Sequence, residues 1–339
     1  MIILRKILFP IGIIYWVVTF IRNFFYDRGI FKSHSFDDPI IAVGNLSVGG
    51  TGKSPQIEYL IRLLSDKYKV ATLSRGYKRS TTGFVLADYT ATAKTLGDEP
   101  YQFYSKYPKT IVAVDEDRVE GIEILFELDN KPDLILLDDA FQHRKVKAGF
   151  YILLTAYDDL FCDDFILPFG NLRESNIGKK RADMIIVTKC PININELAQQ
   201  KIIDKLKVTQ PVYFTSIVYD EYVYSETEKV LVEELKKEDK IVVAGIAKPQ
   251  PFFSFLEVNL NETLVFSDHH DFEEKDIATI LNKAKNKKII TTEKDYVRLR
   301  GLLPKEQLYY LPIQSQFIDL GSDFDKKIMN YVEQSSRNG

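Results

Sequence analysis

The chain has 339 residues and a formal net charge of −3, with 45 lysines and arginines against 48 aspartates and glutamates. A chain of this length exceeds one comfortable core, so two domains with an appendage are the natural expectation. The near balance of charge, without a long basic run, argues against a general nucleic-acid binder, and two cysteines, Cys162 and Cys190, give neither a disulfide framework nor a metal-site spacing.

An apolar segment near the N-terminus is the first predicted element. Residues 7–20 (ILFPIGIIYWVVTF) are almost entirely apolar, with Arg5 and Lys6 before them and Arg22 after them. The run is shorter than the roughly 20 apolar residues of a spanning helix, and no small-residue cleavage site of a signal peptide follows it. Its aromatic residues and basic flanks favour a helix at a membrane interface over a buried core helix. Whether residues 1–30 span the bilayer or lie in it stays open.

A glycine-rich loop follows the strand-like run 40–43. Residues 44–55 read GNLSVGGTGKSP, and a buried strand leading into a turn that ends in Gly-Lys-Ser has the layout of a phosphate-binding loop. Lys53 can reach the β- and γ-phosphates, and the Ser54 hydroxyl can join a Mg²⁺ shell. Ser47 stands where the strict motif has its first glycine. We expect a nucleoside triphosphate to bind along Ser47, Val48, Gly49, Gly50, Thr51, Gly52, Lys53 and Ser54.

Strand-like and helical segments alternate after this loop, which is typical of a parallel α/β sheet. Helices are expected at 56–65 and 118–128. Strands are expected at 40–43, 70–73, 110–114, 134–137, 151–154 and 184–187. The pattern predicts a P-loop NTPase-like parallel-sheet domain over residues 31–210.

Two acidic pairs stand where a ligand of such a sheet would bind. Asp138 and Asp139 follow the strand at 134–137, at the edge where open parallel sheets hold their ligands, and an acidic residue there helps to hold Mg²⁺ in phosphoryl-transfer enzymes. Asp98 and Glu99 begin a helix. A carboxylate there could act as a base for an acceptor hydroxyl, although helix capping explains the pair equally well. The residues alone do not rank Asp98 above Glu99.

Three further segments carry basic residues, and the first of them lies at the same predicted edge. Arg75 follows the strand at 70–73 and could meet phosphate. Arg173, in the polar loop 168–174, is a candidate for bidentate phosphate contact, with a solvated surface arginine as the alternative. Residues 188–191 (TKCP) stand where guanine-specific enzymes carry Asn-Lys-x-Asp. Because the Asp is absent, guanine specificity is not expected.

The pattern changes in the second half of the chain. Residues 211–224 (PVYFTSIVYDEYVY) are rich in β-branched and aromatic residues, which predicts an antiparallel ribbon joining two domains. A smaller α/β domain over residues 225–339 is expected to follow. Its predicted strands are 240–244, 264–266, 288–291 and 309–311, with a closing helix at 323–334.

Two polar clusters follow strands of this second domain. In residues 267–271 (SDHHD) the adjacent histidines would point to opposite faces of a strand, so a shared metal ion is disfavoured. A better use is one imidazole oriented by Asp268 or paired with a carboxylate from the first domain. Residues 291–295 (TTEKD) place a charged cluster beside them. The residues alone do not choose between His269 and His270.

Seven motifs recur in a fixed order along the chain. They are residues 44–55, 74–77 (SRGY), 97–100 (GDEP), 138–143 (DDAFQH), 172–174 (LRE), 268–270 (DHH) and 292–295 (TEKD). Together they resemble the tetraacyldisaccharide 4′-kinases, the lipid A 4′-kinases of Gram-negative bacteria, over nearly the whole chain. The departures are mild. Ser54 replaces a frequent Thr, and Asn171 and Ser175 replace frequent prolines beside 172–174.

The resemblance implies an ATP-dependent kinase of lipid A biosynthesis at the cytoplasmic face of the bacterial inner membrane. Its acceptor would be the 4′-hydroxyl of a tetraacyl glucosamine disaccharide 1-phosphate. Asp98 would be the catalytic base, His269 its partner from the second domain, and Arg173 a candidate for phosphate or transition-state charge. ATP and Mg²⁺ are the implied cofactors, and no protein partner is evident. The candidates for the Mg²⁺ shell are Ser54, Glu99, Asp138 and Asp139.

Two rival functions use the same loop differently. A nucleotide-driven switch or metallochaperone would explain Lys53 and Ser54 but would leave the apolar N-terminus without a purpose, and the guanine or metal-ligand element that it needs is missing. A non-catalytic membrane scaffold would leave Asp98 and Asp138 unexplained.

Overall fold

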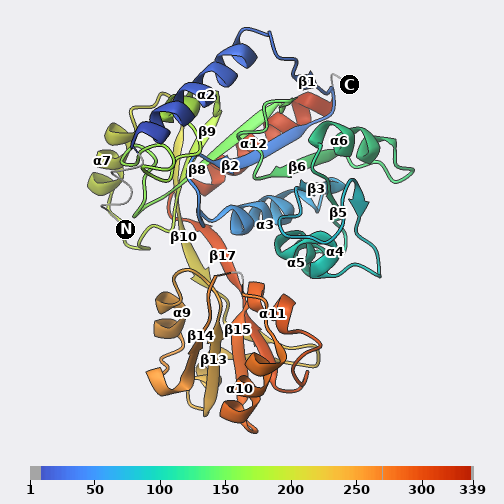
Figure 1. The fold of residues 1–339 in the computed structure, drawn as a ribbon, viewed down its shortest axis with the longest axis vertical. Helices are drawn as coiled ribbons and strands as arrows, with labels where there is room; N and C mark the ends of the chain where they lie inside the picture. The colour runs from blue at the N-terminus through green and yellow to red at the C-terminus, as the bar shows by residue number, and fades with distance from the viewer. Residues whose placement is uncertain (1–8, 269, 337–339) are drawn as a thin grey trace.

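The computed structural model describes residues 9–268 and 270–336. Within them the strands form a nine-stranded sheet (the large sheet), a six-stranded sheet (the small sheet) and a two-stranded pair. Figure 1 shows the two large assemblies one above the other, with the small sheet below and β10 and β17 running between them.

The large sheet has the order β17-β10-β9-β8-β2-β6-β3-β5-β4. Its strands are β2 (Ile40–Asn45), β3 (Val70–Ser74), β4 (Val85–Leu86), β5 (Ile111–Val114), β6 (Leu134–Asp138), β8 (Phe150–Ala156), β9 (Met184–Thr188), β10 (Val212–Tyr219) and β17 (Ile313–Phe317). From β10 to β5 every pair is parallel, while β4 and β17 are antiparallel to their neighbours. Each predicted strand of the first half is therefore confirmed, and every residue of β2 is buried.

Helices cover this sheet and connect its strands. They are α2 (Phe9–Asp27), α3 (Lys53–Leu64), α4 (Ala93–Leu96), α5 (Asp98–Lys106), α6 (Arg118–Glu127), η1 (Asn176–Arg181), α7 (Glu196–Leu206) and α12 (Gly321–Ser336). The short strands β1 (His34–Ser35) and β7 (Val146–Lys147) pair with each other. In α3, Ile57, Leu60, Ile61 and Leu64 are fully buried at helical spacing against the sheet. This burial fixes the first turn of α3, which carries Lys53, beside the end of β2.

The small sheet has the order β12-β11-β16-β15-β13-β14. Its strands are β11 (Tyr222–Tyr224), β12 (Lys229–Leu231), β13 (Lys240–Ala244), β14 (Thr263–Val265), β15 (Lys288–Thr292) and β16 (Leu308–Leu311). Its helices are α8 (Val232–Leu235), α9 (Gln250–Phe255), η2 (Leu260–Glu262), α10 (Glu274–Ala284) and α11 (Glu293–Leu299). The four strands predicted there are confirmed within one or two residues.

Residues 211–224 form β10 in the large sheet and β11 in the small sheet, and the antiparallel partner of β10 comes from far along the chain. β10 pairs antiparallel with β17, in register from Thr215 opposite Phe317 to Tyr219 opposite Ile313. Both strands also extend the large sheet at its edge. The chain thus leaves and re-enters the large sheet on neighbouring strands.

The closing helix α12 packs on the large sheet, whereas the sequence pattern placed residues 323–334 with the second domain. Phe324, Ile328 and Val332 are fully buried in the same core cluster as Ile41 of β2. The Tyr331 hydroxyl also exchanges hydrogen bonds with the backbone N–H and C=O of Ile40, both at 3.1 Å. An amphipathic pattern gives a helix and its buried face but not the sheet that the face covers, which explains the difference.

Helix α2 docks through its polar face. Tyr15 donates to the carbonyl of Arg173 at 2.8 Å, Arg22 to the carbonyl of Gln142 at 2.9 Å, and Asn23 to the Glu174 carboxylate at 2.6 Å. The opposite, apolar face is exposed at Ile13, Ile14, Val17, Ile21 and Phe24. Among the described residues, no helix has both the length and the apolar character needed to cross a membrane.

A buried ion-pair cluster joins the two assemblies. Lys106 at the end of α5 contacts Glu58 of α3 at 2.7 Å and Glu293 of α11 at 2.6 Å. Glu58 also accepts hydrogen bonds from Gln102 and Tyr107. Lys106 therefore neutralises one carboxylate from each side of the boundary.

Candidate active site

The phosphate-binding loop lies between the buried end of β2 and the first turn of α3. Gly52 is the residue before the helix and has φ 84°, a left-handed conformation that favours glycine. Gly44 packs so closely on the next segment that a β-carbon there would lie 2.7 Å from the β-carbon of Phe141. These glycines have backbone and packing roles that other residues would disturb.

A second segment runs alongside this loop and carries Arg173. The Val48 N–H donates to the carbonyl of Asn171 at 2.8 Å, and the Arg173 N–H donates to the carbonyl of Leu46 at 2.7 Å. Ser47 is buried and bridges to Leu172 in this pairing. The residue that departs from the strict motif thus sits in a short β-type contact that holds Arg173 next to the loop.

Lys53, Asp139 and Arg173 form one charged cluster. The Lys53 ammonium is 3.6 Å from Asp139 Oδ1, and Arg173 Nη1 lies 3.0 and 2.9 Å from the two oxygens of Asp139. Burial alone would raise the pKa of Asp139, but the two cations outweigh it and hold the pKa below its usual value. Asp139 therefore stays ionised and keeps both basic side chains beside the loop.

Asp138 has a different environment, although it is the next residue. Burial, reinforced by the charge of Asp139, raises the pKa of the Asp138 carboxyl to about 6, and the charge of Glu99 is near enough to add to this effect. Ser74 lies 3.5 Å from Asp138 Oδ2, while Oδ1 is buried with no hydrogen-bond partner among the described residues. Buried polar atoms are normally satisfied, so this oxygen suits a ligand that the protein chain does not supply.

Asp98 and Glu99 begin α5 and face the first turns of α11. Arg298 Nε donates to Asp98 Oδ2 at 3.0 Å and its Nη2 group donates to the same oxygen, while the Lys294 ammonium lies 2.7 Å from Glu99. The residue that caps α5 is Gly97, without a side-chain cap. Both carboxylates therefore engage cations of the other assembly, which helix capping alone would not predict.

Of the two candidate histidines, the structure describes only His270. His269 lies outside the described residues. His270 Nε2 lies 2.8 Å from Asp276, its Nδ1 lies 3.3 Å from the Ser267 hydroxyl, and its ring stacks on Phe266 at 4.9 Å. These contacts hold His270 within the small-sheet assembly. In the described part of the chain, no group of three or more His, Cys, Asp or Glu side chains has the arrangement of a metal site.

Sequence reasoning missed the cations that organise this site. Arg118 is fully buried and donates to the backbone carbonyls of Asp115 and Asp138. Arg298 lies 3.6 Å from Asp295, which in turn accepts hydrogen bonds from Gly245 and Thr292. Arg298 comes three residues after the TEKD motif, on the same face of α11 as Asp295. That spacing was the available signal.

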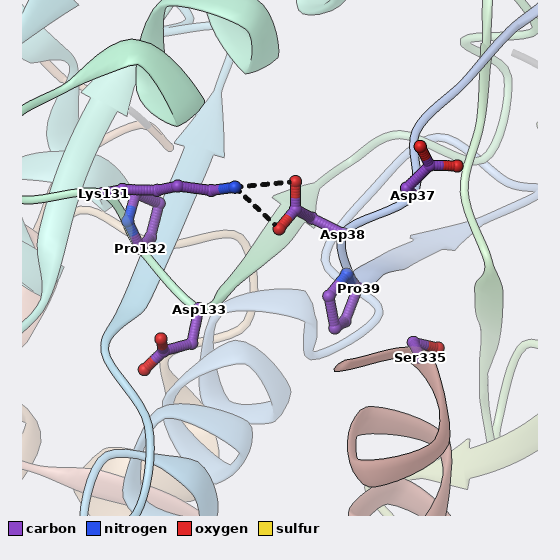
Figure 2. A pocket seen from close by; sticks show the side chains of 7 residues that line it. All are labelled: Asp37, Asp38, Pro39, Lys131, Pro132, Asp133 and Ser335. Carbon is purple, nitrogen blue, oxygen red and sulfur yellow. Dashed lines mark hydrogen bonds and ion pairs between the residues drawn. The ribbon is translucent and has the colours of Figure 1, made fainter. Parts of the chain in front are cut away.

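Two cavities lie away from this cluster. One, of about 300 Å³, is lined by Asp37, Asp38, Lys131 and Asp133 at the amino ends of β2 and β6, the edge opposite the loop (Figure 2). There Lys131 pairs with Asp38 at 3.0 Å. The other, of about 190 Å³, lies between α5 and α11 beside Lys106 and Glu293. Neither is lined by residues of the glycine-rich loop.

Comparisons with known proteins agree across the length of the chain. The family model described as "LpxK: Tetraacyldisaccharide-1-P 4′-kinase" matches residues 4–333. A tetraacyldisaccharide 4′-kinase of Flavobacterium psychrophilum is 61% identical over 340 residues, covering 99% of both chains. One from Bacteroides thetaiotaomicron is 43% identical, covering 99% of this chain and 95% of that protein. The crystal structure of "apo" form LpxK from Aquifex aeolicus in complex with ATP superposes with a TM-score of 0.80 at 30% identity, covering 97% of this chain and 99% of that one.

Proposed function

The chain belongs to the tetraacyldisaccharide-1-phosphate 4′-kinase family, and from this premise we propose how its residues share the reaction. The protein is an ATP-dependent kinase of lipid A biosynthesis. It transfers the γ-phosphate of ATP to the 4′-hydroxyl of the tetraacyl glucosamine disaccharide 1-phosphate. The main structural support for this function is the charged cluster of Lys53, Asp139 and Arg173 beside the glycine-rich loop.

The donor side of the reaction belongs to the loop and its neighbours. Backbone N–H groups of the loop and the Lys53 ammonium hold the phosphates, and Arg173 supplies charge to the transferring group. The unpaired, buried Asp138 Oδ1 and the hydroxyl of Ser54 are oxygen donors of the kind that Mg²⁺ prefers, with Glu99 and Asp139 close by. Bound Mg²⁺ would neutralise phosphate charge. These residues fit that ion.

The acceptor side belongs to the boundary between the assemblies. Asp98 accepts the proton of the attacking hydroxyl, and His269 is its partner, a role that rests on the family motif. Arg298 fixes one oxygen of Asp98 from α11. The ribbon at 211–224 and its partner strand β17 act as the hinge between the domain at 31–210 and the domain at 225–339. Helix α12 is the part of 225–339 that belongs with the first domain. A base oriented across this boundary is in place only when the two sides meet, which limits futile hydrolysis of ATP.

Phosphate transfer is tested directly with γ-labelled ATP and a detergent-solubilised acylated disaccharide. Appearance of label on the 4′ position supports the kinase. Release of labelled phosphate without transfer would instead support a nucleotide-driven switch, and neither product would support a scaffold.

Replacing Arg298 by alanine is expected to lower kcat about 10- to 100-fold, because a misplaced base costs rate even when substrates bind. The KM for ATP should change little, and Arg298→Lys should restore part of the activity. Steady-state kinetics on both substrates measure this. Arg300 lies two residues after Arg298 and forms an ion pair with Glu226. Arg300→Ala is therefore the matched control and should keep kcat. If the Arg298→Ala and Arg300→Ala variants have the same kcat, Arg298 does not position the base.

We also propose that α2 lies in the inner-membrane interface at the cytoplasmic face, with the acceptor lipid beside it. The helix is oriented with its polar face on the protein and its apolar face outward, the reverse of an ordinary surface helix. Its polar face contacts Arg173 and Glu174 directly. A membrane-bound α2 would therefore bring the lipid surface next to the donor site.

The double variant Ile14→Ser, Val18→Ser removes two exposed apolar side chains, 64% and 59% exposed, from one face of α2. Its partition onto anionic phospholipid vesicles should fall by about 10-fold or more, from the apolar area lost to the membrane. Vesicle flotation measures this. Leu260→Ser is the control, since Leu260 is 82% exposed but lies in the small-sheet assembly. Flotation of the double variant at the level of the control would contradict the proposal.

A further inference from the structure

Asp295 is fully buried where three parallel strands of the small sheet end. Its Oδ2 atom accepts a hydrogen bond at 2.9 Å from the N–H of Gly245, the residue after β13. The same atom accepts one at 2.7 Å from the hydroxyl of Thr292, the last residue of β15. A β-carbon at Gly245 would lie 2.8 Å from Asp295 Oδ1 and 3.3 Å from the carbonyl oxygen of Ser267, which follows β14. The carboxylate therefore fills the space that a side chain at residue 245 would need.

The same carboxylate lies beside Arg298, one turn later in α11. Asp295 Oδ1 is 3.6 Å from Arg298 Nη1, and the Arg298 side chain is only 9% exposed. Burial raises the pKa of Asp295, while the hydrogen bonds from Gly245 and Thr292 and the charge of Arg298 oppose the rise. A buried carboxylate is costly without a cation beside it, so this pair restricts where the guanidinium can lie.

Arg298 carries this restriction across the boundary to the proposed base. Its Nε and Nη2 groups donate to Asp98 Oδ2, whereas its Nη1 group faces Asp295. A guanidinium is a rigid, planar group, so a shift at Nη1 also moves the two N–H groups that hold Asp98. The position of Asp98 Oδ2 thus depends on a carboxylate that is fixed to the small sheet.

We propose that Asp295 is a positioning residue for phosphate transfer: through Arg298 it holds Asp98 in the direction that the acceptor hydroxyl requires. Its hydrogen bonds with Gly245 and Thr292 fix the carboxylate to the sheet, and its contact with Arg298 transmits that position to the other assembly. This inference rests on the proposed function for the role of Asp98. A change at Asp295 should therefore affect the rate only while Arg298 is present.

Two variants disturb this carboxylate in different ways. Asp295→Asn keeps the size of the side chain and an oxygen that can accept from Gly245 and Thr292, but it places an uncharged amide beside Arg298. Gly245→Ala keeps the charge and displaces Oδ1. In both variants the kcat for transfer of labelled phosphate from ATP to the acylated disaccharide should fall about 10-fold, because a misplaced base costs rate. The KM for ATP should change little.

A double-mutant cycle with Arg298→Ala separates positioning from a general loss of structure. Added to Arg298→Ala, either change should cost less than about 2-fold in kcat, since the connection to Asp98 is already broken. Glu262→Gln is the matched control, because Glu262 is a capping carboxylate of the same assembly that accepts the N–H of Asn259 at 3.0 Å. It should keep the wild-type kcat, and thermal melting compares the folding of all variants.

The outcomes at Asp295 and at Asp98 can be told apart. Additive losses in the cycle, or wild-type kcat in both single variants, would overturn the positioning role of Asp295. If Asp98→Ala at the same time shows its expected large loss, the proposed function stands and Asp295 alone is excluded. An unimpaired Asp98→Ala enzyme would instead overturn the proposed base, and with it the role of Asp295 in holding that base.

Discussion

Asp98→Ala is expected to lower turnover by about two to four orders of magnitude, the usual contribution of a general base, while ATP binding stays largely intact. Asp98 lies at the start of α5, on the acceptor side, and its carboxylate accepts hydrogen bonds from Arg298 of α11. The loss should therefore appear in kcat. Phosphate transfer to the acylated disaccharide and calorimetric titration with ATP measure the two quantities separately.

Glu99→Ala is the comparison that separates a base from a residue of the Mg²⁺ shell. Excess Mg²⁺ should recover part of the activity of the Glu99 variant and none of that of the Asp98 variant, since added ion compensates for a weakened shell but not for a missing base. Unimpaired turnover in Asp98→Ala would remove Asp98 from its proposed role.

Lys106→Met is expected to destabilise the protein by about 3–5 kcal/mol, the cost of leaving a buried charge without its partner. The variant removes the cation shared by Glu58 and Glu293, whose side chains are 1% and 7% exposed. Glu58 would keep Gln102 and Tyr107, but Glu293 would keep only the backbone N–H of Ile313 among its described contacts. Urea denaturation measures the change. Lys131→Met, which breaks the exposed pair with Asp38 (Figure 2), should cost less than about 1 kcal/mol.

The destabilisation should depend on pH with a defined sign. Burial, reinforced by the charge of Glu58, raises the pKa of Glu293 to about 7, although Lys106 opposes this. The pKa of Glu293 is about 4.5 in the unfolded chain and about 7 in the folded protein. As the pH rises from 4.5 to 7, the carboxyl ionises more readily in the unfolded chain, so the free energy of unfolding falls over this range. Without Lys106 this decrease is larger, so the gap to wild type should widen toward pH 8 and narrow below pH 5. Adding Glu293→Gln should recover much of the loss at pH 8. A gap that is constant with pH would assign the loss to packing instead.

The central parallel strands of both sheets could be predicted because strands buried on both faces are short, continuous apolar runs. Every residue of Ile40–Asn45 is buried, and the sequence shows it as an apolar run before the glycines. The destination of α12 could not be predicted. Its buried face, Phe324 to Val332, carries no information on which of two apolar surfaces it meets, and the choice depends on the long-range return through β17.

The candidate site was predictable where one motif supplies both position and chemistry. The loop and the acids after β6 are adjacent to strand ends, so parallel topology alone brings Lys53 and Asp139 together. The cross-boundary cations were not predictable in the same way. Arg298 meets Asp98 because two helices from distant parts of the chain face each other, and a surface arginine has the same local sequence. The exposed apolar face of α2 was expected, but its polar docking to Glu174 was not.

The pairing of β10 with β17 makes the small-sheet assembly an insertion within a single strand-to-strand connection of the large sheet. Tyr219 and Ile313 are opposite each other in the ladder, a spacing that a two-residue hairpin turn can bridge. The segment between them can thus be regarded as a module carried on a β-hairpin, while the donor loop, its charged neighbours and α12 belong to one uninterrupted scaffold. In evolutionary terms, such an architecture lets a nucleotide-binding fold acquire acceptor-side residues by lengthening one turn, without rearranging the order of its strands.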